Sequence, residues 1–502
     1  MTSLPILSHF ARFAQPFRSV LTRSGSVAPR PTLTYWSQHP AQLPDFVQQS
    51  ALALRYVQLL GLLDWEHFPE RALQPCGNRL PMPYAPFVAA CLIKLDQHLP
   101  YLAHLHQFLV DNPAVVWVLG FPLTPSDQTP WGFDVQRSLP TPRHFTRLLH
   151  TIPKAVFQFL LDDSVRLLQT ELQAQGHTLG QCISLDTKHI VAWVKENNPK
   201  AYVSDRFDKD KPPTGDPDCR LGCKRRHNQR TAAEPPPTPH ANPVPAKTLA
   251  VGEFYWGYGS GIVAAKIPEY CEFVLAELTQ PFDQADVSYF FPLMAATEQR
   301  LGFRPPYAAL DAAFDAFYVY DYFHNAGGFA AIPFSERGGH KTRPFAADGA
   351  PLCAAGLPMH LKYRFLDRST LVEHERGRYV CPLQWPGICA QTCPVNDAHW
   401  AKGGCVSTLP LSPGARLRHT LDRHSDDYRT VYKQRTATER INSQAVDLGI
   451  ERPKLRNGQA IANLNTLIYT LINLRALHRL RQLPCAPPVP EQPSTGHAPI
   501  IS

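Results

Sequence analysis

The chain has 502 residues, of which 44% are hydrophobic and 18% charged, and its formal net charge is +8 at pH 7. This balance indicates a globular protein with a sizeable core and excludes a disordered chain. At roughly 150 residues per domain, the length predicts about three compact units, or one core with large insertions.

Composition also bears on the compartment. The chain contains no run approaching the roughly 20 apolar residues that a membrane helix needs, so we expect no membrane partner. Twelve cysteines are too few for a disulfide scaffold in a chain of this length. No secretory leader is evident at the first residue, and together these features predict reduced thiols in a cytoplasm.

The first 178 residues divide into two predicted parts. Residues 1–44 contain four arginines and no acidic residue, and we interpret them as a basic flexible arm rather than an organellar targeting peptide. From 45 to 178, apolar residues recur at intervals of three and four, which predicts an all-helical N-terminal domain. Its last two helices are amphipathic, so they could contact DNA or could pack on the next domain.

Residues 179–335 read as the first part of an α/β core. CISLDTKHIVAWV alternates as a buried strand does, with Asp186 at its centre. A charged, proline-rich stretch over 205–247 predicts an insertion loop. Strands and helices then alternate, and the short strand YAAL ends at Asp311.

The rest of the chain falls into three predicted segments. Residues 336–424 are rich in proline, glycine and cysteine, and predict a second insertion with little helix. Residues 425–482 have helical periodicity again, and 483–502 form a proline-rich tail that we expect to be disordered.

Three acidic residues are candidates for chemistry. Asp186 lies in a predicted strand, where a buried carboxylate is costly without a partner or a metal. Asp311 follows a strand, at the edge where open α/β sheets place their ligands. Glu439 lies in YKQRTATERINSQA, where at about 100° per residue Tyr432, Arg435 and Glu439 fall at about 0°, 300° and 340° on one helix face. Such a face could bind metal, phosphate and sugar together.

The succession SLDTK, a GYG-containing strand, ALDAAFDA and YKQRTATERINSQA resembles the catalytic core of bacterial insertion-sequence transposases of the DDE class. The resemblance implies a ribonuclease-H-like mixed sheet flanked by helices, with the helical N-terminal domain and the two insertions added to it. It also implies catalytic roles for Asp186, Asp311 and Glu439, and a Tyr-x-x-Arg-x-x-x-Glu signature formed by Tyr432, Arg435 and Glu439.

The same resemblance implies the partners and the location. Three carboxylates would hold two Mg²⁺ or Mn²⁺ ions for phosphodiester cleavage and strand transfer. The substrate would be double-stranded DNA, both the terminal repeats of the element and the target. We expect at least a dimer in the synaptic complex, and a cytoplasmic, nucleoid-associated protein.

Some features leave alternatives open. The family's signature usually continues to a lysine seven positions beyond the Glu, where this chain has Val446. Asp315 and Asp321 compete for the second acidic position, and Glu451 for the third. The alternative functions are a non-catalytic DNA-binding derivative of a transposase and a metal-dependent nuclease without strand transfer.

Other side chains could bind zinc or DNA. Four cysteines fall within 25 residues of the second insertion and could hold a structural Zn²⁺ or be free buried thiols: Cys381, Cys389, Cys393 and Cys405. Basic residues on the Glu439 helix and in the first insertion could contact nucleic acid: Lys433, Arg435, Arg440, Lys224, Arg225 and Arg226. Trp193 and Trp256 could stack on a flipped base, although core packing is the simpler interpretation.

Overall fold

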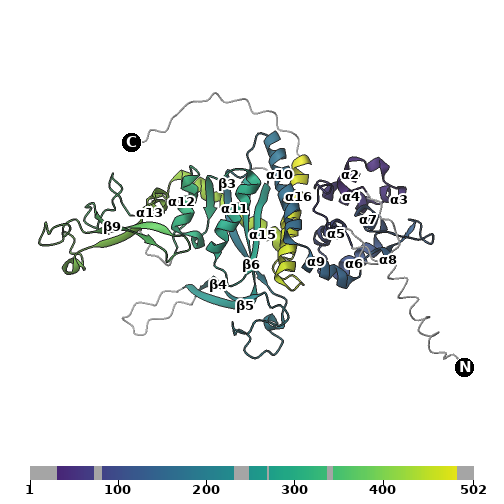
Figure 1. Ribbon diagram of the computed structural model, residues 1–502, viewed down its shortest axis with the longest axis horizontal. Coiled ribbons are helices and arrows are strands. Elements are labelled where there is room, and N and C mark those ends of the chain that lie inside the picture. The colour runs from purple at the N-terminus through teal and green to yellow at the C-terminus, as the bar shows by residue number, and fades with distance from the viewer. Residues whose placement is uncertain (1–30, 73–81, 231–247, 268–270, 336–342, 483–502) are drawn as a thin grey trace, which may run out of the picture.

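The computed structural model describes residues 31–72, 82–230, 248–267, 271–335 and 343–482. Of these, the side chains from 225 to 251 are not described. The molecule is elongated, with N-terminal helices at one end, a central sheet, and the second insertion at the other end (Figure 1). The predicted arm up to residue 30 and the predicted tail from 483 lie outside the described residues.

The N-terminal part is mostly helical, with one short strand pair, β1 (Thr124–Pro125) and β2 (Phe133–Asp134). Leu33 and Trp36 are buried on one side of the first described helix, so this part begins before the boundary at residue 45 that the sequence predicted. Its helices are α2 (Leu33–Gln38), α3 (Asp45–Gln48), α4 (Ala51–Leu60), α5 (Tyr84–Asp96), α6 (Leu102–Asp111), α7 (Pro113–Val118), α8 (Val135–Ser138) and α9 (Pro142–Thr151).

Helix α4 shows how the sequence directs this folding. The Ser50 side chain accepts a hydrogen bond from the backbone N–H of Ala53 and so caps the helix. Buried residues then recur at the three- and four-residue spacing that gives a helix one apolar face. The helix ends at Gly61, where a Cβ would lie only 2.4 Å from the carbonyl oxygen of Val57.

The central sheet is mixed, and its main strands lie in the order β6-β5-β3-β7-β8. Strand β3 is antiparallel to β5 and parallel to β7, which is parallel to β8. The strands are β3 (Cys182–Val191), β4 (Arg220–Arg230), β5 (Thr248–Ile267), β6 (Cys271–Pro281), β7 (Tyr307–Leu310) and β8 (Phe329–Ala331).

The predicted loop over 205–247 is partly a strand. Strand β4 pairs with the first half of the 20-residue strand β5, and the two project from the body of the sheet (Figure 1). Composition alone argued against order here, because few apolar residues are available for burial. The backbone is ordered instead by hydrogen bonds to a strand that extends beyond the sheet. Residues 231–247 lie outside the described part.

Helices cover both faces of the sheet, which confirms an α/β fold. One face packs against α15 (Thr436–Asp447) and α16 (Gly458–Gln482), and the other against α11 (Phe290–Leu301) and α12 (Phe317–Asn325). Helix α10 (Lys154–Ala174) runs beside α16, and these two lie between the sheet and the N-terminal helices (Figure 1).

Helix α16 is buried along most of its length, and its buried side chains include asparagines and threonines as well as leucines. Asn473 donates to the Ser164 hydroxyl of α10 and to the backbone carbonyl of Val274 on β6. Thr466 donates to the Glu277 carboxylate at 2.6 Å. Since buried polar groups are costly unless they are hydrogen-bonded, these contacts fix α16 in one position.

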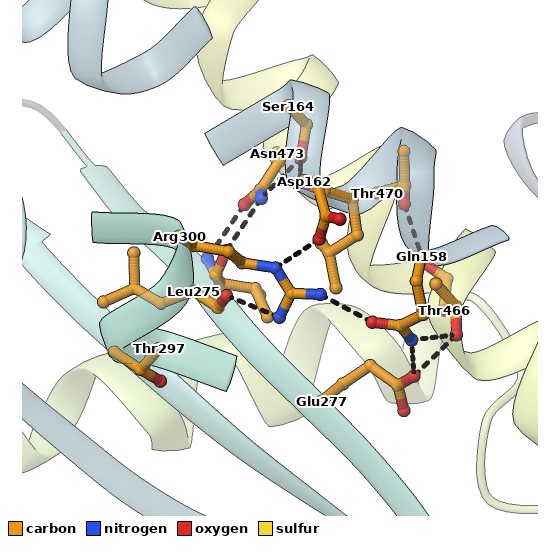
Figure 2. Close-up of polar contacts among 12 residues, drawn as sticks. Gln158, Asp162, Ser164, Leu275, Glu277, Thr297, Arg300, Thr466, Thr470 and Asn473 are labelled. Atoms are coloured by element: carbon orange, nitrogen blue, oxygen red, sulfur yellow. Dashed lines mark hydrogen bonds and ion pairs between the residues drawn. The ribbon is translucent and has the colours of Figure 1, made fainter. Parts of the chain in front are cut away.

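A second group of contacts joins α10, α11 and β6 (Figure 2). The Arg300 guanidinium bonds to Asp162 and Gln158 of α10 and to the backbone carbonyl of Leu275 on β6. Gln158 donates in turn to Glu277. These polar contacts hold helices from both sides of the sheet to the same strand.

The second insertion forms a small sheet of its own, in the order β11-β10-β9, with a core of Met359, Tyr379 and Leu409. Its elements are β9 (His360–Asp367), β10 (His374–Val380), β11 (Val406–Pro410) and α13 (Pro413–Thr420). The chain then enters α14 (Asp426–Tyr432), a 3₁₀ turn η6 (Lys433–Arg435) and α15. Within the described ranges, no helix combines the length and the apolarity that a membrane span requires.

Candidate functional site

Asp186 and Asp311 lie side by side where β7 ends. The parallel strands β3 and β7 pair in a register that sets Leu185 opposite Leu310, and the two aspartates are the next residues on each strand. The Asp311 carboxylate accepts a hydrogen bond from the backbone N–H of Ala313 at 2.9 Å, which caps the short turn after β7 and orients the side chain. Two carboxylates therefore lie next to each other at the C-terminal end of β7.

The surroundings of these carboxylates disfavour their charged forms. Burial raises the pKa of Asp186 to about 6, and the negative charges of Asp311 and Asp286 act in the same direction. Burial also raises the pKa of Asp311. The positive charge of Arg435 opposes both shifts. Crowded carboxylates of this kind are characteristic of functional sites, and a bound cation would relieve their repulsion.

Asp286 is a third carboxylate of this site, and it was not predicted from the sequence. It begins the 3₁₀ turn η3 (Asp286–Tyr289), and its Oδ1 accepts a hydrogen bond from the Thr187 hydroxyl at 2.6 Å. The GYG segment of β5 makes room for this turn, since a Cβ at Gly259 or Gly261 would lie 2.4 Å from Tyr289 atoms. The glycines are evident in the sequence, but the residue that packs on them is not.

Helix α15 packs over β3 and brings Arg435, Glu439 and Asn442 toward the aspartates. Asn442 donates from Nδ2 to Asp186 Oδ2 at 3.0 Å. Arg435 pairs through Nη1 with Glu439 Oε1, also at 3.0 Å, and the Glu439 side chain is 56% exposed. Glu439 is thus bound to the same guanidinium whose charge acts on both aspartates. Asn442 was not predicted, although its place three residues after Glu439 puts it on the same helix face.

Tyr432 precedes a break in the helix. The helical periodicity predicted over 426–449 is interrupted by the 3₁₀ turn η6. A 3₁₀ turn advances about 120° per residue instead of about 100°, so the angle between Tyr432 and Glu439 becomes about 40° instead of about 20°, and both side chains remain on one face. The Tyr432 ring stacks on Tyr428, with ring centroids 5.8 Å apart and planes 13° apart.

The donor set suits a hard divalent cation, since magnesium and manganese prefer carboxylate oxygens. Asp186 and Asp311 offer such oxygens from adjacent strands, and burial is the main cause of their raised pKa values. Over the residues that the structure describes, however, no three His, Cys, Asp or Glu side chains converge as a complete metal-binding group. Two of the three predicted carboxylates are therefore adjacent, while Glu439 is held by Arg435.

The competing acidic residues have structural partners. Asp315 forms a two-point ion pair with Arg418, at 2.9 and 2.7 Å, which lowers its pKa. Asp321 accepts from the Ser412 hydroxyl and from the backbone at the start of α13. Glu451 pairs with Lys188 at 2.6 Å. Val446, which replaces the family's lysine, packs on the core.

The four cysteines that could hold zinc or be free thiols do not form one metal-binding cluster within the described residues. Cys381 and Cys405 follow and precede the register pair Val380–Val406, which brings them together at one end of β10 and β11. Burial raises the pKa of Cys405 to about 12, with the neighbouring thiols of Cys381 and Cys353 contributing. Cys389 is exposed and Cys393 partly buried.

The candidate nucleic-acid contacts differ in their surroundings. Lys433 is exposed, Arg440 pairs with Glu272 at 2.7 Å, and the charge of Lys224 acts on Glu451. Arg225 and Arg226 lie on β4, and their side chains are outside the described part.

The two tryptophans differ in burial. Trp256 is fully buried, and its indole N–H donates to the backbone carbonyl of Arg206, so it is a core residue. Trp193 is 43% exposed.

No model of a known protein family matches this chain, and no curated protein sequence matches it either. The side chains around Asp186 and Asp311 are therefore the basis for a functional proposal.

Proposed function

We propose that this protein is a DNA transposase of the DDE class, which cleaves DNA at the ends of a mobile element and joins those ends to target DNA. The observation that carries the proposal is the register of β3 and β7, which sets Asp186 beside Asp311 with both carboxylates largely withdrawn from water. A structural role does not explain two adjacent carboxylates whose mutual repulsion is only partly offset by one arginine.

The order of elements along the chain supports a ribonuclease-H-like core. Of the five strands β3, β5, β6, β7 and β8 that form the body of the sheet, the first carries Asp186 and the fourth precedes Asp311. Glu439 follows on a later helix that packs on β3. This is the distribution of the three acidic residues in the family that the sequence resembles.

The side chains of this site would have separate roles. Asp186 and Asp311 would hold divalent ions, with Glu439 completing the acidic set. When bound, these ions neutralise charge on the reacting phosphate and lower the pKa of an attacking water. Arg435 would contact the scissile phosphate, which its guanidinium suits geometrically. Asn442 keeps Asp186 in one orientation through its hydrogen bond.

The proposed reaction has two steps, and atoms balance in each. Water attacks the phosphodiester at the end of the element, leaving a 3′-hydroxyl and a 5′-phosphate. That 3′-hydroxyl then attacks a phosphodiester of the target, forming one bond and breaking one. Joining two ends to one target requires a synaptic complex, which we propose to contain at least two copies of this chain.

Labelled duplexes that cover both ends of the DNA segment encoding this chain provide the test. We expect nicking and joining that need Mg²⁺ or Mn²⁺ and stop with a chelator. Asp311→Ala should lower the rate by about 10³-fold or more, since it removes a ligand of the reacting centre, while DNA binding persists. Asp127→Asn, an exposed loop substitution, is the matched control and should change neither.

Three outcomes would contradict the proposal in different ways. Cleavage that survives Asp311→Ala would exclude the assigned site. Cleavage without joining would indicate a nuclease, and DNA binding with neither reaction would indicate a non-catalytic derivative.

A further inference from the structure

A short irregular segment after α15 carries three exposed cations. From Arg452 to Arg456 exposure alternates: Arg452, Lys454 and Arg456 are exposed, whereas Pro453 and Leu455 are buried. The three positive charges are therefore gathered on the surface within five residues of chain. We call these three cations the basic row.

This row borders an exposed tryptophan. The Arg456 guanidinium lies 5.2 Å from the centre of the Trp193 ring, and the Lys454 ammonium 5.9 Å from it. Arg456 also donates from Nε to the backbone carbonyl of Trp193 at 3.1 Å, so its position is fixed. On the other side Tyr101 of the N-terminal helices, 41% exposed, lies 6.4 Å from the Trp193 ring. Segments from three parts of the chain thus meet at one aromatic and basic patch.

The charge of this patch is not cancelled locally. Its nearest acidic side chain along the chain, Glu451, pairs with Lys188 and is also acted on by Lys224 and Arg452. The next, Asp218, accepts hydrogen bonds from the Asn457 side chain and from the backbone of Gly458.

The rest of the basic C-terminal region differs. Arg475 of α16 pairs with Asp96, and Arg481 pairs with Glu171. Arg479 lies beside Cys271. Of the cations that follow residue 451, Lys454 and Arg456 lie beside Trp193, and Arg452 lies two residues before Lys454.

The patch lies at a defined position relative to the candidate active site. Trp193 follows Asp186 by seven residues at the end of β3, and β7 pairs only with residues 182–185 of that strand. The backbone N–H of Val191 bonds to the carbonyl of Glu451, which places the basic row beside the same strand end. At about 3.3 Å per residue the separation is at most about 23 Å, or roughly seven base pairs at 3.4 Å each.

We propose that Arg452, Lys454 and Arg456, with Trp193 and Tyr101, form a second DNA-contact surface that binds the duplex within about seven base pairs of the cleaved bond. We call it the basic ledge. The cations would contact successive backbone phosphates, and the two rings would pack against the strand between them. The position of the ledge on the DNA rests on the proposed function, but its affinity for DNA does not.

The test measures binding of labelled duplexes by fluorescence anisotropy over a range of salt concentrations, without divalent ions. In the ledge variant Arg452, Lys454 and Arg456 are each replaced by Gln. In the control variant Lys362, Arg368 and Lys402, exposed cations of the second insertion, are replaced in the same way. Removing one cation that binds a phosphate should lower the slope of log K against log salt by about 0.9. We expect a decrease of about 2 to 3, and roughly 10- to 100-fold weaker binding, in the ledge variant alone.

Two further comparisons locate the surface on the DNA. Shortening the duplex from 12 to 4 base pairs on the ledge side should weaken binding of the unmodified protein but not of the ledge variant. Trp193→Ala should weaken binding about tenfold, whereas Trp193→Phe keeps an aromatic ring and should retain most of it. Thermal unfolding shows whether each variant is folded. If Trp193→Ala is unfolded, Trp193→Phe still tests the role of the aromatic ring.

If the ledge and control variants have the same affinity and the same salt slope, the basic ledge does not contact DNA, even if the protein cleaves DNA. Conversely, a protein that shows no cleavage but loses DNA binding in the ledge variant would overturn the proposed reaction and leave the ledge in place.

Discussion

Two carboxylates in one row of the central sheet, the half-buried Asp186 and the buried Glu277, have opposite surroundings. Asp186 on β3 faces Ile262 on β5, and Ile262 faces Glu277 on β6, so both carboxylates lie on the same sheet face. The Oε1 atom of Glu277 receives donors from Gln158 and Thr466 and lies 3.4 Å from the Lys154 ammonium (Figure 2). Its Oε2 atom is buried without a hydrogen bond to the described residues.

Asp186 instead has other carboxylates as its neighbours. It receives one side-chain hydrogen bond, from Asn442, and lies near the charges of Asp311 and Asp286. A carboxylate that joins two helices to a strand stabilises the fold. A carboxylate crowded by other carboxylates destabilises the fold, and the proposed metal site would explain its position.

The largest predicted effect is a difference in DNA cleavage rate between substitutions at Asp186 and at Glu277. Asp186→Asn should lower the rate of metal-dependent DNA cleavage by about 10³-fold or more, because it removes a charged ligand for the ions. Glu277→Gln should leave the rate per folded molecule within about threefold, since amide and carboxylate have similar shapes and no reacting atom is near. Single-turnover cleavage rates of both variants measure this difference. Equal decreases would contradict the assignment of a catalytic role to Asp186 and a structural role to Glu277.

The next effect concerns stability. Glu277→Ala leaves Lys154, Gln158 and Thr466 without their common acceptor, and breaking a buried charged contact costs about 3 to 5 kcal/mol in the free energy of unfolding. Urea unfolding at pH 7 measures this decrease. Glu373→Ala, which removes a 61% exposed carboxylate, is the control and should change stability by less than about 0.5 kcal/mol. A decrease below about 1 kcal/mol for Glu277→Ala would show that the interactions around it are replaceable.

A smaller effect of opposite sign is expected at Asp186. Folding raises its pKa from 3.8 to about 6, so the folded state holds a proton that the unfolded state releases between these pH values. The free energy of unfolding of the metal-free protein therefore falls as pH rises through this window, by up to about 3 kcal/mol.

Asp186→Asn cannot release this proton and should be the more stable protein at pH 7. Its advantage should disappear below about pH 4, which urea titrations at both pH values will show. A variant less stable than the parent at pH 7 would mean that the charge of Asp186 is well compensated in the folded protein.

The sequence predicted those parts of the fold that depend on neighbouring residues. Strand β3 and strand β7 were recognisable because apolar side chains alternate or run together over a few positions. The adjacency of Asp186 and Asp311 was implied by the resemblance to the transposase core, and the rule about strand ends placed only Asp311 at the edge of the sheet. The strands themselves needed only local patterns.

Features that depend on contacts between distant segments were not predicted. Asp286 reaches the site because a turn packs on the glycines of β5, and no local pattern marks it. Strand β4 was read as part of a loop because its composition is polar, whereas its order comes from pairing with β5. The 3₁₀ turn after Tyr432 also interrupts a stretch in which helical periodicity alone indicates one continuous helix.

The position of α16 has a consequence for how the protein is made. This helix, Gly458–Gln482, lies between the N-terminal helices and the sheet, yet the ribosome adds it about 300 residues after α10. At about 5 to 20 residues per second, the apolar side of α10 waits roughly 15 to 60 s for this helix, and the carboxylate of Glu277, about 200 residues before the end of α16, waits roughly 10 to 40 s. The nascent chain exposes these surfaces until residue 482 has been added, so chaperones that bind apolar segments have their longest access to it during this interval.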